Sequence, residues 1–269
     1  MRAAGFAGNV AAVNLPPRFN VLGTGVSALS LDQARDLVLT ARGQSKLGYV
    51  CCATAYNLNL ARADSALRTA YHQSFLNTAD GMPLVWLGRW HGHKEITRVY
   101  GPDLMLAVCD AGRATGLKHY FYGGANGVAE ELRAKLTTRF PGLQVVGTFT
   151  PPFRRLDPTE LMRLQADIAG CQPDIIWVGL STPKQEKFMA EFAPALDAGL
   201  LIGVGAAFDF LSGRVPQAPR WMQRSGLEWF HRLCTEPGRL WKRYLVHNPM
   251  FVMRTLAQLT GLHKYPLDR

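Results

Sequence analysis

One acidic residue stands where a strand is expected to give way to a helix. The apolar residues 75–77 predict the end of a strand, and Pro83 suits the first turn of a helix over residues 83–89. This spacing places Asp80 at the carboxyl edge of an open α/β sheet, where ligands bind. A carboxylate there could accept a proton from a substrate hydroxyl, although an aspartate that caps the helix explains the same spacing.

A glycine-rich stretch forms a second candidate site. Apolar residues 119–122 predict a strand that leads into Gly123, Gly124 and, after two residues, Gly127, with a helix over 128–139 directly after. Strand, glycine loop and helix in this order can bind an anion, because the free amides of the first helical turn point at it. These glycines are therefore candidate substrate contacts, although a turn that needs glycine for its shape is an equal alternative. The spacing is not GxGxxG and no acid ends the next strand, which disfavours a dinucleotide site.

Polar residues also follow the later strands. Gln185 lies in a polar loop after a strand at 175–178, and Asp209 lies at the end of an apolar strand that begins at residue 200. Arg98 and Asp103 flank the start of another helix and are candidate substrate contacts; a surface salt bridge is the alternative for Arg98 and a structural role for Asp103. The histidines are not spaced as metal ligands, so we expect no metal. We expect no organic cofactor either.

The elements that must position these residues alternate between strands and helices. The alternation predicts a Rossmann-like, doubly wound and mostly parallel α/β sheet whose loops meet at one edge. We expect strands at residues 47–54, 75–77, 119–122, 143–148, 175–178 and 200–204, and helices at 30–43, 56–72, 83–89, 102–116, 128–139, 158–169 and 187–192.

The composition changes after Gly213. The remaining residues are rich in Trp, Arg and Pro, and the prolines are expected to divide them into short helices. Aromatic residues interleaved with cations suit a membrane interface or a nucleic-acid surface, while a helical pair packed on the sheet is the alternative for residues 221–233. We divide the chain into a flexible tail (1–18), an α/β core (19–213) and a basic, aromatic-rich helical appendage (214–269).

Charge and cysteine content narrow the class of protein. The net charge is +10, and hydrophobic residues make up 48% of the chain, as in a globular protein. From Arg220 onward there are nine Lys and Arg and three acids, so six of the ten excess charges lie in the last fifth of the chain and suggest a polyanionic partner, either phosphates or an anionic membrane. The five cysteines form no CxxC pair and indicate a reducing compartment. No stretch reaches the roughly 18 apolar residues of a spanning helix, so we expect a cytoplasmic protein that is peripheral to a membrane.

Several ordered motifs together resemble a known family, the WecG/TagA/CpsF bacterial glycosyltransferases. This family includes the N-acetylmannosaminyltransferase of wall teichoic acid synthesis and the N-acetylmannosaminuronyltransferase of enterobacterial common antigen. The resemblance covers roughly residues 47–243. The matching stretches are residues 79–83, 98–104, 122–130, 183–186, 203–210, 218–222, 226–233 and 236–241.

The resemblance implies a function. Members transfer a sugar, with inversion and without an essential metal, from a UDP-sugar to a polyprenyl-diphosphate-linked saccharide at the inner face of the cytoplasmic membrane. The appendage is implied to dock on the anionic membrane surface and to complete the active site. No nucleic-acid partner is implied, and a homo-oligomer stays open.

The resemblance also assigns roles to residues. Asp80 matches the proposed catalytic base, and Gln185 matches a functional glutamine. Arg239 and Arg243 match appendage arginines that would meet the diphosphate. Because the chain contains no Asp-x-Asp motif, the charge of the departing UDP would be met by the glycine-loop amides and the basic appendage.

One departure from the family bears on the donor sugar. Many members have Thr-x-Asn at the end of the strand before the catalytic aspartate, whereas this chain has Cys52-Ala53-Thr54. Thr54 can still hydrogen-bond a sugar hydroxyl, but the asparagine contact is missing, so the donor sugar stays open.

Two other functions remain as alternatives. A nucleotide-dependent oxidoreductase would use the glycine loop, and the absent ribose-binding acid argues against it. A non-catalytic adaptor would use only the basic tail, to hold an anionic membrane surface or a nucleic acid.

Overall fold

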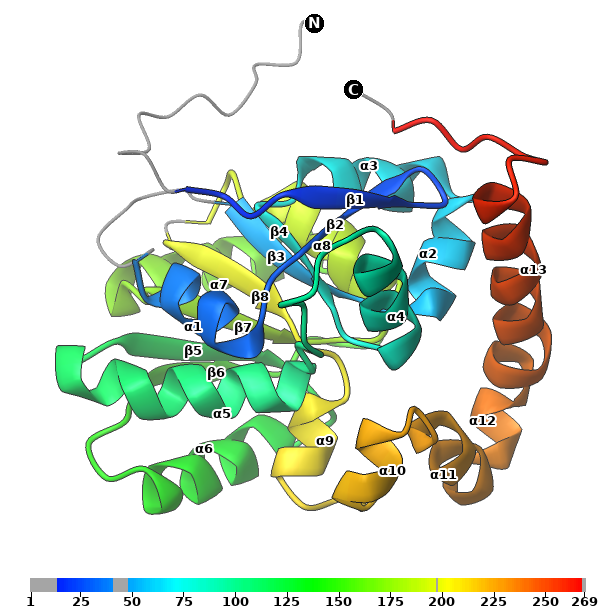
Figure 1. The fold of residues 1–269 in the computed structure, drawn as a ribbon. Coiled ribbons are helices and arrows are strands. Elements are labelled where there is room, and N and C mark those ends of the chain that lie inside the picture. The colour runs from blue at the N-terminus through cyan, green and yellow to red at the C-terminus, as the bar shows by residue number, and fades with distance from the viewer. Residues whose placement is uncertain (1–13, 41–47, 197, 268–269) are drawn as a thin grey trace, which may run out of the picture.

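The sheet is parallel and six-stranded, which confirms the predicted doubly wound α/β class. The computed structural model describes residues 14–40, 48–196 and 198–267 (Figure 1). The strand order is β4-β3-β8-β7-β5-β6. The strands are β3 (Gly48–Ala53), β4 (Leu76–Ala79), β5 (Lys118–Gly123), β6 (Gln144–Phe149), β7 (Ile175–Gly179) and β8 (Leu200–Gly203).

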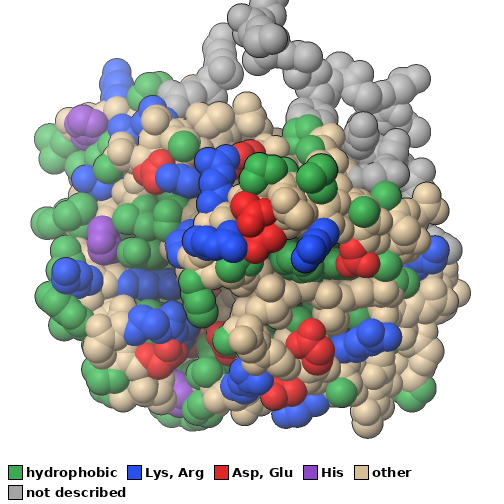
Figure 2. Space-filling view, turned by 180° about the vertical axis from the view of Figure 1, so that it is seen from behind, with side chains coloured by type: hydrophobic (Ala, Val, Ile, Leu, Met, Phe, Trp, Pro, Cys, Tyr) green, Lys and Arg blue, Asp and Glu red, His purple; other side chains and the backbone are tan. Residues whose placement is uncertain are grey.

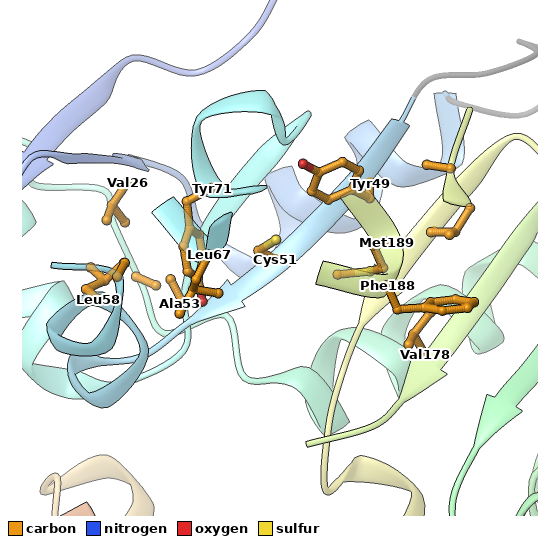
Figure 3. Close-up of a cluster of buried hydrophobic side chains, with 14 of the residues drawn as sticks. Val26, Tyr49, Cys51, Ala53, Leu58, Leu67, Tyr71, Val178, Phe188 and Met189 are labelled. Carbon is orange, nitrogen blue, oxygen red and sulfur yellow. The ribbon is translucent and has the colours of Figure 1, made fainter. Parts of the chain in front are cut away.

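Helices cover both faces of the sheet. One hydrophobic cluster packs α2, α3, α7 and α8 on one face, and a second packs α1, α5, α6 and α9 on the other. Along β3 the side chains alternate, so that Tyr49 and Cys51 join the first cluster and Val50 the second. Figure 3 shows part of the first cluster, with Tyr49 and Cys51 on β3 and Met189 on α8. Two apolar faces explain why the strand sequences are nearly continuous apolar runs.

The helices of the core follow the predicted order, except that α9 was not predicted, α8 begins early enough to include Gln185, and one predicted helix is divided. The helix expected over 56–72 is two helices, because Asp64 interrupts it and caps the second by accepting a hydrogen bond from the amide of Leu67. The core helices are α1 (Leu31–Thr40), α2 (Ala55–Ala61), α3 (Ser65–Gln73), α4 (Met82–Trp90), α5 (Gly101–Ala111), the 3-10 turn η1 (Gly112–Thr115), α6 (Val128–Arg139), α7 (Pro158–Cys171), α8 (Lys184–Phe192) and α9 (Ala207–Leu211). The expected end of the first helix near residue 43 lies outside the described residues.

A small antiparallel hairpin precedes the core and was not predicted. It consists of β1 (Arg18–Val21) and β2 (Thr24–Ser27), which pair with each other and are four residues long each. Most of the expected N-terminal tail lies outside the described residues, but Arg18 already belongs to β1. Four-residue strands are too short for an alternation pattern to identify them.

The appendage forms three helical pieces. These are α10 (Arg220–Arg224), α11 (Glu228–Thr235) and a longer run made of α12 (Pro237–Trp241), the π-helical turn η2 (Lys242–His247) and α13 (Asn248–Leu259). The expected break at Pro249 is wrong: α12, η2 and α13 follow one another without interruption (Figure 1). The π turn widens the backbone just where the proline ring would otherwise meet the carbonyl of Leu245. Of the described helices, none is both long and apolar enough to cross a membrane.

Candidate active site

Asp80 follows β4 directly, at the carboxyl edge of the sheet. Its backbone amide donates to the carbonyl of Ala53, which extends the β3–β4 pairing by one residue. Gly81, not Asp80, is the N-cap of α4, and no side chain caps that helix. The predicted junction of strand and helix is therefore confirmed, and the alternative of a capping aspartate is wrong.

Arg98 joins Asp80 to a residue of the appendage. Its Nη2 lies 3.5 Å from Oδ1 of Asp80 and 2.5 Å from Oε2 of Glu228, and its Nε donates to the backbone carbonyl of Asp80. The side chains of Arg98, Asp80 and Glu228 are 16%, 17% and 13% exposed. The alternative of a surface salt bridge for Arg98 is therefore wrong, because the three charges form a largely buried cluster.

This environment sets the protonation of Asp80. Burial is the largest cause and raises the pKa of its carboxyl from 3.8 to about 7, with the negative charge of Glu228 adding to the rise. Arg98, Arg243 and Arg232 lower the pKa and offset part of the rise. A carboxylate with a pKa near neutrality is suited to general base catalysis at neutral pH.

The appendage supplies cations to this cluster. Arg232, one turn after Glu228 on α11, is 13% exposed, and its guanidinium lies 5.3 Å from the centre of the Phe210 ring. Arg243, in the π turn, lies over Tyr56 at 4.7 Å. The sequence analysis did not select Glu228 or Arg232, although both lie in the motif at 226–233 and their i, i+4 spacing places them on one helix face.

The two predicted tail arginines separate in the structure. The positive charge of Arg243 lowers the pKa of Asp80, whereas that of Arg239 lowers the pKa of Asp209. Arg239 is 58% exposed and pairs with Glu236. Asp209 itself lies in α9 and not at a strand end as expected, because the chain turns into a helix directly after Ala206. Burial is the largest cause that raises the pKa of its carboxyl.

Gln185 is held by a buried carboxylate. Its side-chain nitrogen donates to Oε1 of Glu186 at 3.0 Å, and Thr182 donates to the same oxygen at 2.9 Å. Glu186 is fully buried, which raises the pKa of its carboxyl. Within the described residues, Oε1 of Gln185 has no hydrogen-bond partner, and it would lie 3.6 Å from a Cβ at Gly205. This oxygen is available to a ligand at the loop that follows β8.

The hydroxyl of Thr54 is already engaged. It caps α2 by accepting from the amide of Asn57 at 3.3 Å, and it donates to Oδ1 of the same residue at 2.9 Å. Because its single proton is used, Thr54 can meet a ligand only as an acceptor.

Local packing and backbone shape explain why glycine occupies three positions in the glycine loop. A Cβ at Gly123 would lie 2.5 Å from the carbonyl oxygen of Gly179, and one at Gly124 would lie 2.8 Å from Cβ of Val128. The amide of Gly124 also donates to Gly179, so it is not free for an anion. Gly127 has a φ of +80° and is the N-cap of α6. The close pairing of β5 with β7 therefore accounts for Gly123, the contact with Val128 of α6 accounts for Gly124, and the shape of the turn accounts for Gly127.

The candidate residues follow successive strands along one edge. Asp80 follows β4, Thr54 follows β3, Asp209 comes after β8, Gln185 comes after β7 and Gly123 ends β5. With strands about 4.8 Å apart, Asp80 and Gly123 stand roughly 19 Å apart along this edge. The glycine loop therefore does not contact Asp80, but both can contact one extended ligand.

Asp103, the remaining candidate, is paired with Arg220 of the appendage. It lies in the first turn of α5 and accepts two hydrogen bonds from Nη1 of Arg220, at 2.9 and 3.0 Å. Across the described ranges, no three His, Cys, Asp or Glu side chains cluster so as to hold a metal ion.

The sheet defines a Rossmann-like α/β protein, and the charged cluster makes the carboxyl edge of its strands the candidate ligand site. The chain belongs to the glycosyl transferase WecG/TagA/CpsF family, whose model matches residues 19–265. This confirms the resemblance seen in the sequence.

Two relatives carry the same name, N-acetylglucosaminyldiphosphoundecaprenol N-acetyl-beta-D-mannosaminyltransferase. The Bacillus subtilis protein is 31% identical over 166 residues, which cover 62% of this chain and 62% of the relative. The Bacillus spizizenii protein is 31% identical over 186 residues, which cover 67% of this chain and 70% of the relative. The matched region thus spans less than two thirds of the Bacillus subtilis protein's length.

Proposed function

We propose that this protein is an inverting, metal-independent glycosyltransferase that moves a sugar from a UDP-sugar to a polyprenyl-diphosphate-linked saccharide. The observation that supports it best is Asp80, a carboxylate at the sheet edge with a pKa of about 7, surrounded by arginines. The names of the two relatives supply the acceptor class and make N-acetylmannosamine the first donor sugar to test.

In the proposed reaction Asp80 takes the proton of an acceptor hydroxyl. The oxygen of that hydroxyl forms a bond to the anomeric carbon of the donor sugar, while the bond from that carbon to the UDP oxygen breaks. The negative charge that develops on UDP is met by Arg243, Arg232 and Arg239 from the appendage, because a guanidinium offers charge and a two-pronged donor to phosphate. Such fixed cations supply the stabilisation that a metal gives in other transferases.

The order of residues along the sheet edge suits an extended donor. We place the nucleoside toward Gly127 and Asp209, the diphosphate over the ends of β8 and β3, and the sugar beside Thr54 and Asp80. The glycine loop then holds the far end of UDP, and the appendage arginines, not the loop amides, meet the leaving diphosphate.

The outer face of the appendage suits a membrane surface. The helix that runs through η2 and α13 exposes Leu245, Val252, Met253 and Leu256, and Lys242 is exposed one turn before Leu245. Figure 2 shows hydrophobic side chains mixed with Lys, Arg and His along the side of the molecule that carries this helix. Apolar and basic residues on one face favour peripheral binding to the anionic inner face of the cytoplasmic membrane, where a polyprenyl-linked acceptor resides. This surface does not require a nucleic-acid partner.

A screen of nucleotide sugars tests the proposal. We expect UDP and one or more UDP-sugars to raise the melting temperature, since a ligand at a hundred times its Kd adds about 2.7 kcal/mol of stability. The hits are then given to the protein with a lipid-linked N-acetylglucosaminyl diphosphate, and product is followed by mass spectrometry. Stabilisation by a nicotinamide dinucleotide without any response to UDP would favour the oxidoreductase instead.

Replacing Glu228 with glutamine is expected to move the pH dependence of transfer. Glu228 raises the pKa of Asp80, so its removal lowers that pKa. Because the reaction needs Asp80 unprotonated, the acidic limb of the kcat/KM profile should shift to lower pH by about half a unit or more. The exposed Glu191 on α8, changed in the same way, is the matched control and should leave the limb in place. An unshifted limb in Glu228→Gln would remove Glu228 from the tuning of the base.

A further inference from the structure

A separate pocket lies on the outer side of Asp80, between α4 and α10. Its volume is about 460 Å³, and its charged lining consists of Arg89, Arg98, Asp103, Arg220 and Arg224, with Thr97 and Gln223 as neutral polar neighbours. Met82, Val85 and Arg89 of α4, the helix that follows the edge strand β4, form one side of this pocket. Arg98 lines the pocket and also contacts Asp80, so the pocket borders directly on the proposed base.

Two of the four arginines in this pocket have no acidic partner. Arg98 is paired with Asp80 and Glu228, and Arg220 is paired with Asp103. Among the described residues, no acidic side chain forms an ion pair with Arg89 or Arg224. Two unpaired guanidinium groups in one concave site favour an anion with two charged centres, and a diphosphate presents one phosphate to each.

Exposed tryptophans distinguish this pocket from the donor edge. Trp86 and Trp90 on α4 are 52% and 75% exposed, and Trp221 on α10 is 64% exposed. These are the same two helices that line the pocket, so large amphipathic rings lie next to its cations. Tryptophan suits a boundary between water and lipid, whereas a soluble nucleotide has no need of such a rim.

We propose that the pocket between α4 and α10 binds the diphosphate of the lipid-linked acceptor, with Arg89 and Arg224 as its phosphate ligands. This inference rests on the proposed transfer reaction and assigns its acceptor site. The acceptor saccharide then reaches Asp80 from the outer side, while the donor approaches along the sheet edge. This arrangement is compatible with inversion at the anomeric carbon, in which the nucleophile attacks the face opposite the leaving group.

Neutralising the two arginines that have no acidic partner tests the inference. We would prepare Arg89→Gln, Arg224→Gln and the double variant in the full chain, with Arg133→Gln on the exposed face of α6 as the matched control. Both pocket residues are exposed, so the folded structure should tolerate the change. The acceptor is a water-soluble, short-chain saccharide diphosphate, used without membranes.

We expect the KM for this acceptor to rise tenfold or more in the double variant. The KM for the UDP-sugar and the melting-temperature shift produced by UDP should stay as in the wild type and in Arg133→Gln. An unchanged KM for the soluble acceptor would overturn the inference. A loss seen only when the acceptor is presented in anionic vesicles would overturn it too, since the arginines would then bind lipid headgroups.

Direct binding separates this inference from the proposed reaction. Titration calorimetry with the same saccharide diphosphate needs no turnover, and the Kd should weaken tenfold or more in the double variant. If the wild type binds this probe through Arg89 and Arg224 but transfers no sugar, the pocket stands and the proposed reaction fails. If the wild type transfers sugar but both variants bind the probe normally, the reaction stands and the pocket assignment fails.

Discussion

Replacing Asp80 with asparagine is expected to lower kcat for sugar transfer by about 10²- to 10⁴-fold, the usual contribution of a positioned general base. Asparagine keeps the size of the side chain, but its amide cannot take a proton from the acceptor hydroxyl. The KM for the UDP-sugar should change little, because the diphosphate contacts are proposed for Arg232, Arg239 and Arg243. Initial rates at saturating donor and acceptor measure this effect.

The same substitution is expected to stabilise the protein at alkaline pH. The pKa of Asp80 is about 7 in the folded protein and 3.8 ordinarily, and its side chain is 17% exposed. Well below pH 4 the carboxyl of Asp80 is protonated in both the folded and the unfolded state, so it does not lower the free energy of unfolding. As the pH rises toward 7 the unfolded chain releases its proton while the folded protein retains it, so stability falls until the folded carboxyl also ionises.

The size of this effect makes it measurable. Between pH 5 and pH 8 the wild type should lose about 2–3 kcal/mol of unfolding free energy through Asp80, a loss that Asp80→Asn would not show. Urea denaturation at the two pH values measures it, with Asp36→Asn on the exposed face of α1 as control. Wild-type turnover by Asp80→Asn would remove this residue from the mechanism, and an identical pH dependence of stability would contradict its raised pKa.

The sheet and the place of Asp80 could be predicted because local sequence determines them. Apolar runs bounded by glycine and proline identify all six strands of the parallel sheet. Because Asp80 directly follows one of these strands, it is placed at the carboxyl edge of the sheet. The three-residue gap between α2 and α3 was missed, since its signal is a single aspartate inside an otherwise continuous helical pattern. The hairpin β1–β2 was missed because its strands are only four residues long.

The charged cluster could not be predicted from local sequence. Glu228 and Arg98 lie 130 positions apart, and only the fold of the appendage brings them together. Arg232 and Arg243 reach Asp80 through the packing of α11 and of the π turn, which no periodicity indicates. Helix periodicity could have placed Glu228 and Arg232 on one face, but not which partner that face would meet. The appendage is thus part of the candidate site and not only a means of attachment.

Replacing Arg98 with methionine is expected to destabilise the protein by about 3–5 kcal/mol at pH 8, the usual cost of removing one partner from a buried ion pair. Methionine fills much of the same space, but it leaves the carboxylates of Asp80 and Glu228 without the cation between them. Arg98 is the largest influence that lowers the pKa of Asp80, so that pKa should rise above 7 in the variant. Transfer at pH 7 should fall because Asp80 is then mostly protonated, and it should recover in part as the pH is raised.

The pH dependence of stability distinguishes this electrostatic cause from lost packing. In Arg98→Met the pKa of Asp80 in the folded state is raised further, so the cost of its negative charge is absent near pH 4 and grows as the pH rises toward 8. The destabilisation measured by urea denaturation should therefore be much smaller at pH 5 than at pH 8. Adding Glu228→Gln to the variant removes one of the two uncompensated charges and should restore part of the lost stability at pH 8. A destabilisation that is equal at both pH values, and unrelieved by the second change, would mean that Arg98 serves only to fill space.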